Sequence, residues 1–75
     1  MNRVLLTGAS GFIGTNLVED LISKGYEVCN IDIKPPQVSK RNNIWKNVDI
    51  TDYLSFEKAI LDFKPDYVIH LAART

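Results

Sequence analysis

The sequence predicts an α/β fold, in which the strands of a parallel sheet alternate with helices. Along its 75 residues, short apolar runs of strand length alternate with amphipathic runs of helix length, a pattern typical of β-α-β units. A glycine-rich segment separates the first strand from the first helix. The crossover between such strands is right-handed, which sets the strands parallel. We expect one sheet in the order 3-2-1-4, with helices on both faces.

The first strand and the first helix are predicted from two contrasting apolar patterns. Residues 2–7 contain the continuous apolar run Val4-Leu5-Leu6, as expected for a parallel strand that is covered on both faces. Residues 12–24 show helical periodicity instead, with polar residues on the opposite face. The predicted buried face of this helix carries Ile13, Leu17, Val18, Leu21 and Ile22.

Stop signals and a polar segment define the next elements. Lys24 in the last turn and Gly25 just beyond it end the first helix. Residues 26–32 are predicted to form the second strand. Residues 34–43 combine prolines and polar side chains without periodicity, so we expect a surface loop that contains no helix. Residues 44–48 are predicted to form a short third strand at the sheet edge.

The last helix and strand are predicted from a capping signal and a proline. Thr51 and Asp52 can each offer a side-chain oxygen to the free N–H groups of a helix predicted over residues 53–63. Pro65 disfavours helical geometry at the residue before it and so ends this helix. Residues 66–72 are predicted to form the fourth strand. We expect this strand to be an unpaired apolar edge, through which two copies of the chain could form a homodimer.

Length, charge and composition exclude several classes of function. A chain of 75 residues forms one domain at most. Its formal net charge of zero and its pI of about 6.5 give no indication of nucleic-acid or membrane binding. No apolar stretch approaches transmembrane length, and no signal peptide is expected. The single cysteine, Cys29, excludes an internal disulfide, so we expect a reducing, cytoplasmic location.

The glycine-rich segment carries three glycines spaced three residues apart, Gly8, Gly11 and Gly14. Between a strand and a helix, the first can turn the chain sharply, the second admits a ligand close to the backbone, and the third lets the helix pack tightly on the sheet. The first N–H groups of the helix lack intrahelical partners, so a dinucleotide pyrophosphate is the expected ligand. A P-loop is excluded because Thr15, and not lysine, follows the last glycine.

Asp32 closes the second strand, 24 positions after Gly8. This is close to the offset of about 20 residues expected for the acid that binds the adenosine ribose. A carboxylate there hydrogen-bonds the 2′- and 3′-hydroxyls and repels a 2′-phosphate, so we expect NAD to bind in preference to NADP. A cation at Lys34 or Arg41 could tolerate a phosphate and weaken this preference. The alternative role for Asp32 is that of a solvated acid at a strand end.

The segment Thr7-Gly8-Ala9-Ser10-Gly11-Phe12-Ile13-Gly14 has two residues, rather than one, between its first two glycines. This spacing, with threonine before it, resembles the extended short-chain dehydrogenase/reductase family, whose members include nucleotide-sugar epimerases and dehydratases. The resemblance implies a Rossmann-like domain that binds NAD. It also implies that Asp49 and Ile50 hold the adenine, whereas Asp49 taken alone is a loop acid or a capping residue. The stretch Leu71-Ala72-Ala73 would pass beneath the cofactor.

The residues predicted to bind the cofactor come from the glycine segment, the end of the second strand and this resemblance. They are Gly8, Ser10, Gly11, Phe12, Ile13, Gly14, Asp32, Ile33, Lys34, Asp49, Ile50, Leu71, Ala72 and Ala73. No catalytic residue is predicted, because the family's Tyr-x-x-x-Lys pair is absent after all three tyrosines. His70 is expected to be a packed or hydrogen-bonded strand residue and Cys29 a core residue, and a lone histidine makes a metal site unexpected.

The resemblance covers all 75 residues. It implies that they are the N-terminal part of the dinucleotide-binding domain of a longer NAD-dependent enzyme, a nucleotide-sugar epimerase or dehydratase. We expect this part alone to bind NAD without catalysing a reaction. Two alternatives stay open: a non-catalytic dinucleotide-sensing protein on the same fold, and a related NAD(P)-dependent reductase that releases its reduced cofactor.

Overall fold

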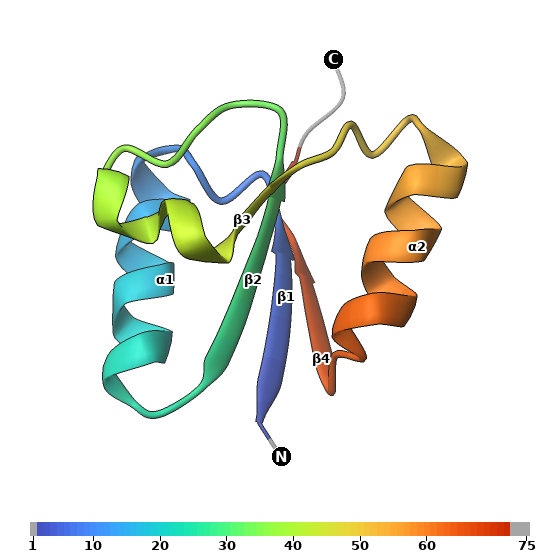
Figure 1. Ribbon diagram of the computed structural model, residues 1–75. Coiled ribbons are helices and arrows are strands. Elements are labelled where there is room, and N and C mark those ends of the chain that lie inside the picture. The colour runs from blue at the N-terminus through green and yellow to red at the C-terminus, as the bar shows by residue number, and fades with distance from the viewer. Residues whose placement is uncertain (1, 73–75) are drawn as a thin grey trace.

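The structure is a computed structural model that describes residues 2–72. In chain order its elements are β1 (Arg3–Thr7), α1 (Phe12–Ser23), β2 (Glu27–Asp32), the 3-10 helix η1 (Ser39–Ile44), β3 (Trp45–Asn47), α2 (Tyr53–Phe63) and β4 (Tyr67–His70). The four strands form one parallel sheet in the order β3-β2-β1-β4. Helix α1 lies on one side of this sheet and α2 on the other (Figure 1). The predicted fold class and strand order are therefore confirmed.

The sheet is built around β1 because this strand is apolar on both faces. Val4, Leu5 and Leu6 are 2%, 0% and 0% exposed, as predicted for a strand that is covered on both sides. Successive strand side chains point to opposite faces, so they divide between two core clusters. These are Val4, Leu6, Ala9, Val18 and Val28 on the α1 side, and Leu5, Cys29, Ile31 and Ala59 on the α2 side.

Two predictions about the α1 side of the molecule are wrong. Ile13, expected on the buried face of the helix, is 75% exposed. It belongs to the first turn of α1, which packs on the glycine segment through Gly14 and Ala9 rather than on strand side chains. Residues 39–43, expected in an irregular loop, and Ile44, expected in the third strand, form η1, a short type of helix that needs no amphipathic pattern. The other element ends differ from prediction by one or two residues at most.

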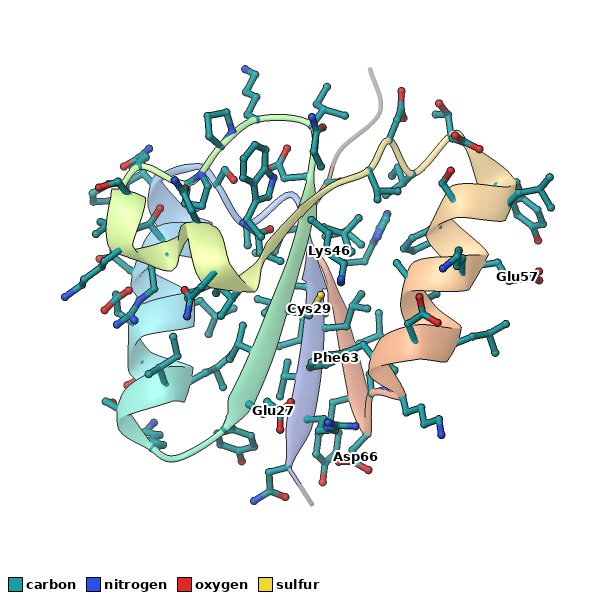
Figure 2. The ribbon with its side chains drawn as sticks, in the orientation of Figure 1. Glu27, Cys29, Lys46, Glu57, Phe63 and Asp66 are labelled. Carbon is teal, nitrogen blue, oxygen red and sulfur yellow. The ribbon has the colours of Figure 1, made fainter. Side chains whose placement is uncertain are left out.

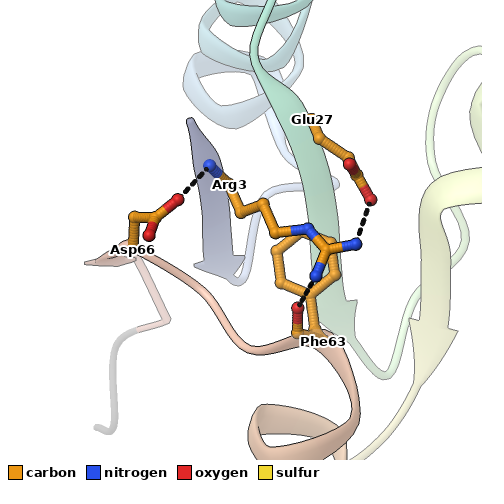
Figure 3. Close-up of polar contacts among 4 residues, drawn as sticks. All are labelled: Arg3, Glu27, Phe63 and Asp66. Atoms are coloured by element: carbon orange, nitrogen blue, oxygen red, sulfur yellow. Dashed lines mark hydrogen bonds and ion pairs between the residues drawn. The ribbon is translucent and has the colours of Figure 1, made fainter. Parts of the chain in front are cut away.

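At the amino end of the sheet, Arg3 is the centre of a group that we call the amino-end clasp, made of Arg3, Glu27, Phe63 and Asp66 (Figure 3). The guanidinium donates to Glu27 Oε2 and to the Phe63 carbonyl, both at 3.0 Å. It also lies 5.4 Å from the centre of the Phe63 ring. The backbone N–H of Arg3 donates to Asp66 Oδ2 at 2.9 Å. The clasp therefore ties β1, β2 and the α2–β4 connection together at one end of the sheet.

Both ends of α2 follow local backbone chemistry. Of the two predicted capping residues, Asp52 is the cap: its carboxylate accepts from the Ser55 hydroxyl at 2.8 Å and from the Ser55 N–H at 3.4 Å. At the other end, Lys64 has φ 55° and ψ 62°, a left-handed conformation that stops the helix. The residue after it is Pro65, as predicted from the disfavoured helical geometry before proline.

Strand β4 lies at the edge of the sheet, where β1 is its partner. Its side chains are more exposed than those of β1, with Tyr67 at 57% and Val68 at 53%. The predicted apolar edge strand is therefore confirmed for the described residues. A sheet edge of this kind offers backbone N–H and C=O groups for pairing with another chain.

Candidate functional site

A cleft of about 470 Å³ opens at the carboxyl edge of the sheet. The glycine segment, the end of β2, the connection after β3 and the end of β4 contribute its walls. Its lining residues are Gly8, Gly11, Ile31, Asp32, Ile33, Lys34, Asp49, Ile50, Thr51, Leu71 and Ala72. In open α/β sheets, ligands bind outside the carboxyl ends of the strands, where the chain order reverses. Here that position lies between β1, which continues to α1, and β4.

Most residues predicted to bind the cofactor line this cleft, although they come from four separate segments of the chain. Four predicted residues do not line it: Ser10, Phe12, Ile13 and Gly14. Phe12 and Ile13 are each 75% exposed, and the other two act on the shape of the glycine segment. Ala73 lies outside the described residues. Ile31 and Thr51 line the cleft without having been predicted to do so.

Gly8 occupies a position that other residues fill only with strain. Its φ of +70° is left-handed, and a Cβ there would lie 2.7 Å from the Cα and N of Ala72. The backbone of Ala72 therefore passes directly against the first turn of the glycine segment. The Gly8 N–H donates to the Ile31 carbonyl at 2.8 Å, which fixes the turn to β2 as well.

Gly14 and Gly11 have opposite surroundings. A Cβ on Gly14 would lie 2.4 Å from Ala9 Cα, so the close approach made possible by Gly14 is to the glycine segment and not, as predicted, to the sheet. A Cβ on Gly11 would meet nothing within 4 Å. Gly11 is the N-cap of α1, with no side-chain capping bond and no acidic residue in the first turn. The positive end of the helix dipole therefore opens on the cleft.

Asp32 is held in one orientation by backbone groups on both of its carboxylate oxygens. The Ser10 N–H donates to Oδ2 at 3.0 Å and the Lys34 N–H donates to Oδ1 at 3.1 Å. The indole of Trp45 donates to the Asp32 carbonyl at 2.8 Å. Each carboxylate oxygen can accept a further hydrogen bond. The side chain is thus positioned before any ligand arrives and is not a freely rotating solvated acid.

Sequence reasoning missed Asn30, which does not line the cleft but hydrogen-bonds the glycine segment. It is 2% exposed, its Oδ1 accepts from the Ala9 N–H at 3.1 Å, and its Nδ2 donates to Ser10 Oγ at 3.1 Å. The Ser10 hydroxyl in turn donates to the Lys34 carbonyl at 2.7 Å. The available signal was an amide side chain inside the apolar run of the second strand, because buried polar groups need specific partners.

Thr7 has a similar role at the end of β4. Its hydroxyl is 2.6 Å from His70 Nδ1 and accepts from the Ala72 N–H at 3.4 Å. Its carbonyl accepts from the Leu71 N–H at 2.9 Å. Thr7 is fully buried, so it secures the strand end that lies against Gly8. His70 is accordingly the hydrogen-bonded strand histidine that the sequence predicted.

Asp49 lies on the far wall of the cleft, and its carboxylate closes a turn. Its Oδ1 accepts from the Thr51 N–H at 2.9 Å and from the Thr51 hydroxyl at 2.7 Å. Asp49 is therefore the loop acid that was predicted as one of its two roles when taken alone, whereas Asp52 caps α2. It also lines the cleft together with Ile50, so its predicted contact with adenine stays a prediction.

Residues 4–75 match the NAD dependent epimerase/dehydratase family. The chain belongs to this family. A probable dTDP-glucose 4,6-dehydratase of Sinorhizobium fredii is 41% identical to it over 83 residues, which cover 97% of this chain and 23% of that protein.

Two solved structures of UDP-glucose 4-epimerases are also similar. The Thermus thermophilus enzyme in complex with NAD is 40% identical, with a TM-score of 0.80, over 97% of this chain and 24% of that one. The Thermotoga maritima enzyme with UDP-glucose is 36% identical, with a TM-score of 0.82, over 97% of this chain and 25% of that one. The chain thus spans about a quarter of the length of these family members.

The two cations that were predicted to tolerate a 2′-phosphate, Lys34 and Arg41, have different surroundings. Lys34 lines the cleft. Arg41, on η1, is held by Glu19 of α1 through two hydrogen bonds of 2.5 and 2.8 Å. The hydrogen bond from Arg41 is the main cause that lowers the pKa of Glu19 below its usual 4.5, and the same bond raises the pKa of Arg41. This pairing opposes the use of Arg41 as a phosphate ligand.

Cys29 and Lys46 lie toward the α2 side of the sheet (Figure 2). Cys29 is 3% exposed, and burial raises the pKa of its thiol despite the opposing effect of Lys46. A thiol with a raised pKa is a poor nucleophile, so Cys29 is the core residue that was predicted. Within residues 2–72, no group of three or more His, Cys, Asp or Glu residues could hold a metal ion. No helix in that range is long and apolar enough to cross a membrane.

Proposed function

We propose that the chain binds the adenosine half of NAD in the carboxyl-edge cleft, as part of a nucleotide-sugar epimerase or dehydratase. The observation that carries this proposal is the fixed Asp32 carboxylate, which shares one cleft with the open helix start at Gly11. A carboxylate suits the two ribose hydroxyls, and a helix start without acidic residues suits the pyrophosphate. The ribose and the pyrophosphate are adjoining parts of the same ligand, NAD.

The remaining walls fit the rest of the adenosine half. Ile33, Asp49 and Ile50 would border the adenine, and the backbone at Leu71 and Ala72 would pass beneath the pyrophosphate side. Small residues at that strand end leave room for a dinucleotide across the sheet edge. When bound, NAD would take up a hydride from the sugar and return it within one turnover; residues of this chain would only bind and orient it.

NAD should bind more tightly than NADP. The Asp32 carboxylate would face a 2′-phosphate directly, and its orientation is fixed by Ser10 and Lys34. Arg41 is engaged by Glu19 and would have to leave that ion pair to reach a phosphate. Because Lys34 is a cation that lines the cleft, we expect NADP still to bind, but more weakly than NAD.

Titration calorimetry with NAD and with NADP tests this proposal. We expect tighter binding of NAD, and we expect Asp32→Asn to weaken it about tenfold or more because charge-assisted hydrogen bonds to the ribose are lost. The same substitution should reduce the difference in affinity between NAD and NADP. Asp62→Asn is the matched control, because Asp62 pairs with Lys58 on the exposed surface of α2. Tighter binding of NADP by the unaltered chain would contradict the assignment of Asp32.

The reaction of the whole protein is part of the same proposal. We expect a nucleotide sugar as substrate and no turnover by these 75 residues alone, because none of the three tyrosines is followed four positions later by lysine. Substrate-dependent formation of NADH by the purified 75-residue chain would refute the second expectation. In the whole protein, NAD that stays bound through turnover supports an epimerase or dehydratase, whereas released NADH supports a reductase.

Self-association through β4 stays a prediction. The strand is at the sheet edge, and Tyr67 and Val68 are more than half exposed. Pairing of two β4 strands would satisfy their outer backbone groups. Light scattering should show a mass that rises with concentration and falls when Val68 is replaced by Lys; a constant monomer mass at high concentration would rule this out.

A further inference from the structure

We propose that Asn30 is a positioning residue that sets the affinity of the cleft for the pyrophosphate and ribose together. This inference rests on the proposed function, since it names the residue that shapes the same cofactor site. Asn30 itself does not line the cleft. It would act on the ligand through Ala9 and Ser10, which belong to the glycine segment.

The orientation of the Asn30 amide is dictated by its partners. The Ala9 N–H can only donate, so it must face the amide oxygen, and the 3.1 Å contact to Oδ1 satisfies that requirement. The amide nitrogen is then left to donate to Ser10 Oγ, also at 3.1 Å. Because the Ser10 hydroxyl receives this hydrogen bond, its own proton is free to go to the Lys34 carbonyl at 2.7 Å. One side chain thus sets the direction of three successive hydrogen bonds.

These hydrogen bonds end on both halves of the proposed ligand site. On one side they hold Ala9 and Ser10, directly before Gly11 and the open start of α1. On the other side they hold the backbone of Lys34, whose N–H donates to the Asp32 carboxylate. The Ser10 N–H donates to the second oxygen of that carboxylate. A series of hydrogen bonds that begins at Asn30 therefore fixes the position of the glycine segment relative to Asp32, the proposed ribose-binding residue.

Because the residues are buried, breaking this series of hydrogen bonds should cost free energy. Asn30 is 2% exposed, Ala9 is 2% exposed and Ser10 is 6% exposed, so water cannot readily replace a lost partner. An aliphatic residue at position 30 would leave the Ala9 N–H without an acceptor. The glycine segment would then move to find one, and Ser10 would carry its N–H away from Asp32.

The first test measures binding of ADP, the part of NAD that carries both the pyrophosphate and the adenosine ribose. We expect Asn30→Leu to weaken ADP binding about tenfold or more in an NMR titration. Two controls should stay within about twofold of the unaltered chain: Asn16→Leu, on the exposed surface of α1, and Val28→Ala, which destabilises the same strand two positions before Asn30. Equal losses in Asn30→Leu and Val28→Ala would reduce Asn30 to a general stabilising residue and overturn the proposal.

A double-substitution cycle separates positioning through Ser10 from an independent effect. Ser10→Ala removes the hydroxyl but keeps the N–H that donates to Asp32. Both substitutions break the same series of hydrogen bonds. The fold-loss of ADP affinity in the double variant should therefore be much smaller than the product of the fold-losses in the two single variants. A fold-loss in the double variant equal to that product would contradict the proposed coupling of Asn30 and Ser10.

Amide hydrogen exchange in the ligand-free chain distinguishes failure of this inference from failure of the proposed function. Asn30→Leu should increase exchange at Ala9 and Ser10 more than at Leu5 and Leu6 in the neighbouring strand. Unchanged exchange at Ala9 would overturn the role of Asn30 even if ADP binds normally. An unaltered chain that binds neither ADP nor NAD would instead overturn the proposed function, and the ligand role of Asn30 with it.

Discussion

The two ends of the sheet use their polar side chains in different ways. At the amino end, the clasp directs the donors of Arg3 to partners within the protein, which are Glu27, Phe63 and Asp66. At the carboxyl end, the hydrogen bonds around Asp32 run behind the wall of a cleft and leave its carboxylate facing open space. The same strands form both ends of the sheet, but the polar groups of the amino end bind one another, whereas those of the carboxyl end border a cleft.

This difference shows how a small sheet can separate stability from recognition. Interactions at the amino end should affect folding without affecting ligand affinity, because they are separated from the cleft by the length of β1. At the carboxyl end, rigid backbone contacts shape the cleft, and a Cβ at Gly11, which lines it, would meet no protein atom within 4 Å. The comparison between Gly14 and Gly11 isolates these two roles within a single turn of helix.

The largest effect is expected for Gly14→Ala. Its Cβ would lie 2.4 Å from Ala9 Cα, so the backbone must move, and the free energy of unfolding should fall by about 3 kcal/mol or more. Gly11→Ala is the matched control, because its Cβ would meet no protein atom within 4 Å. It should cost less than about 1 kcal/mol yet weaken NAD binding. Urea unfolding and calorimetry measure the two quantities, and equal stabilities of the two variants would contradict this contrast.

An intermediate effect is expected for Arg3→Met at the amino end. The substitution keeps the apolar stem but removes the donors to Glu27 and to the Phe63 carbonyl. Because the Arg3 side chain is 36% exposed, solvent screening limits the loss to about 1 kcal/mol in the free energy of unfolding. The NAD affinity of the folded protein should not change. Lys58→Met, in the exposed pair with Asp62, should cost less; a large loss of NAD affinity in Arg3→Met would refute the separation of the two ends.

The smallest effect is expected for Glu19→Gln, which tests the pair that holds η1 on α1. The hydrogen bond from Arg41 lowers the pKa of Glu19 from its usual 4.5. The pair therefore contributes its full stability above that usual value, and this contribution is lost as the pH falls through the lower pKa of the folded state. Urea midpoints of the protein and of Glu19→Gln should differ at neutral pH and converge in acid. Glu57→Gln, at an exposed position of α2 (Figure 2), is the matched control and should leave the urea midpoint at neutral pH unchanged.

The sequence allowed prediction of features that depend on local pattern. The apolar run of Val4 to Leu6 predicted a strand buried on both faces, and the glycine spacing placed the turn and the start of α1. It did not allow prediction of features that depend on which surfaces meet. Ile13 fits the helical period but has no strand above it, and η1 has no periodicity to detect.

The candidate site shows the same division. Spacing identified Gly8, Gly11 and Asp32, because a turn and a strand end are local positions. Asn30 was missed because its partners, Ala9 and Ser10, lie about 20 residues earlier in the chain. Its significance depends on parallel pairing of β1 with β2, which a single amide in an apolar strand does not reveal.

The hydrogen bond from Trp45 to the Asp32 carbonyl makes this protein its own optical probe. Trp45 is the only tryptophan in the sequence, so every change in indole emission comes from one place, at the end of β2. We expect a ligand bound at the Asp32 carboxylate to change the indole emission, because the indole is hydrogen-bonded to the carbonyl of the same residue. Fluorescence would then follow occupancy of the proposed ribose position in real time, without a label and without altering a residue in the cleft.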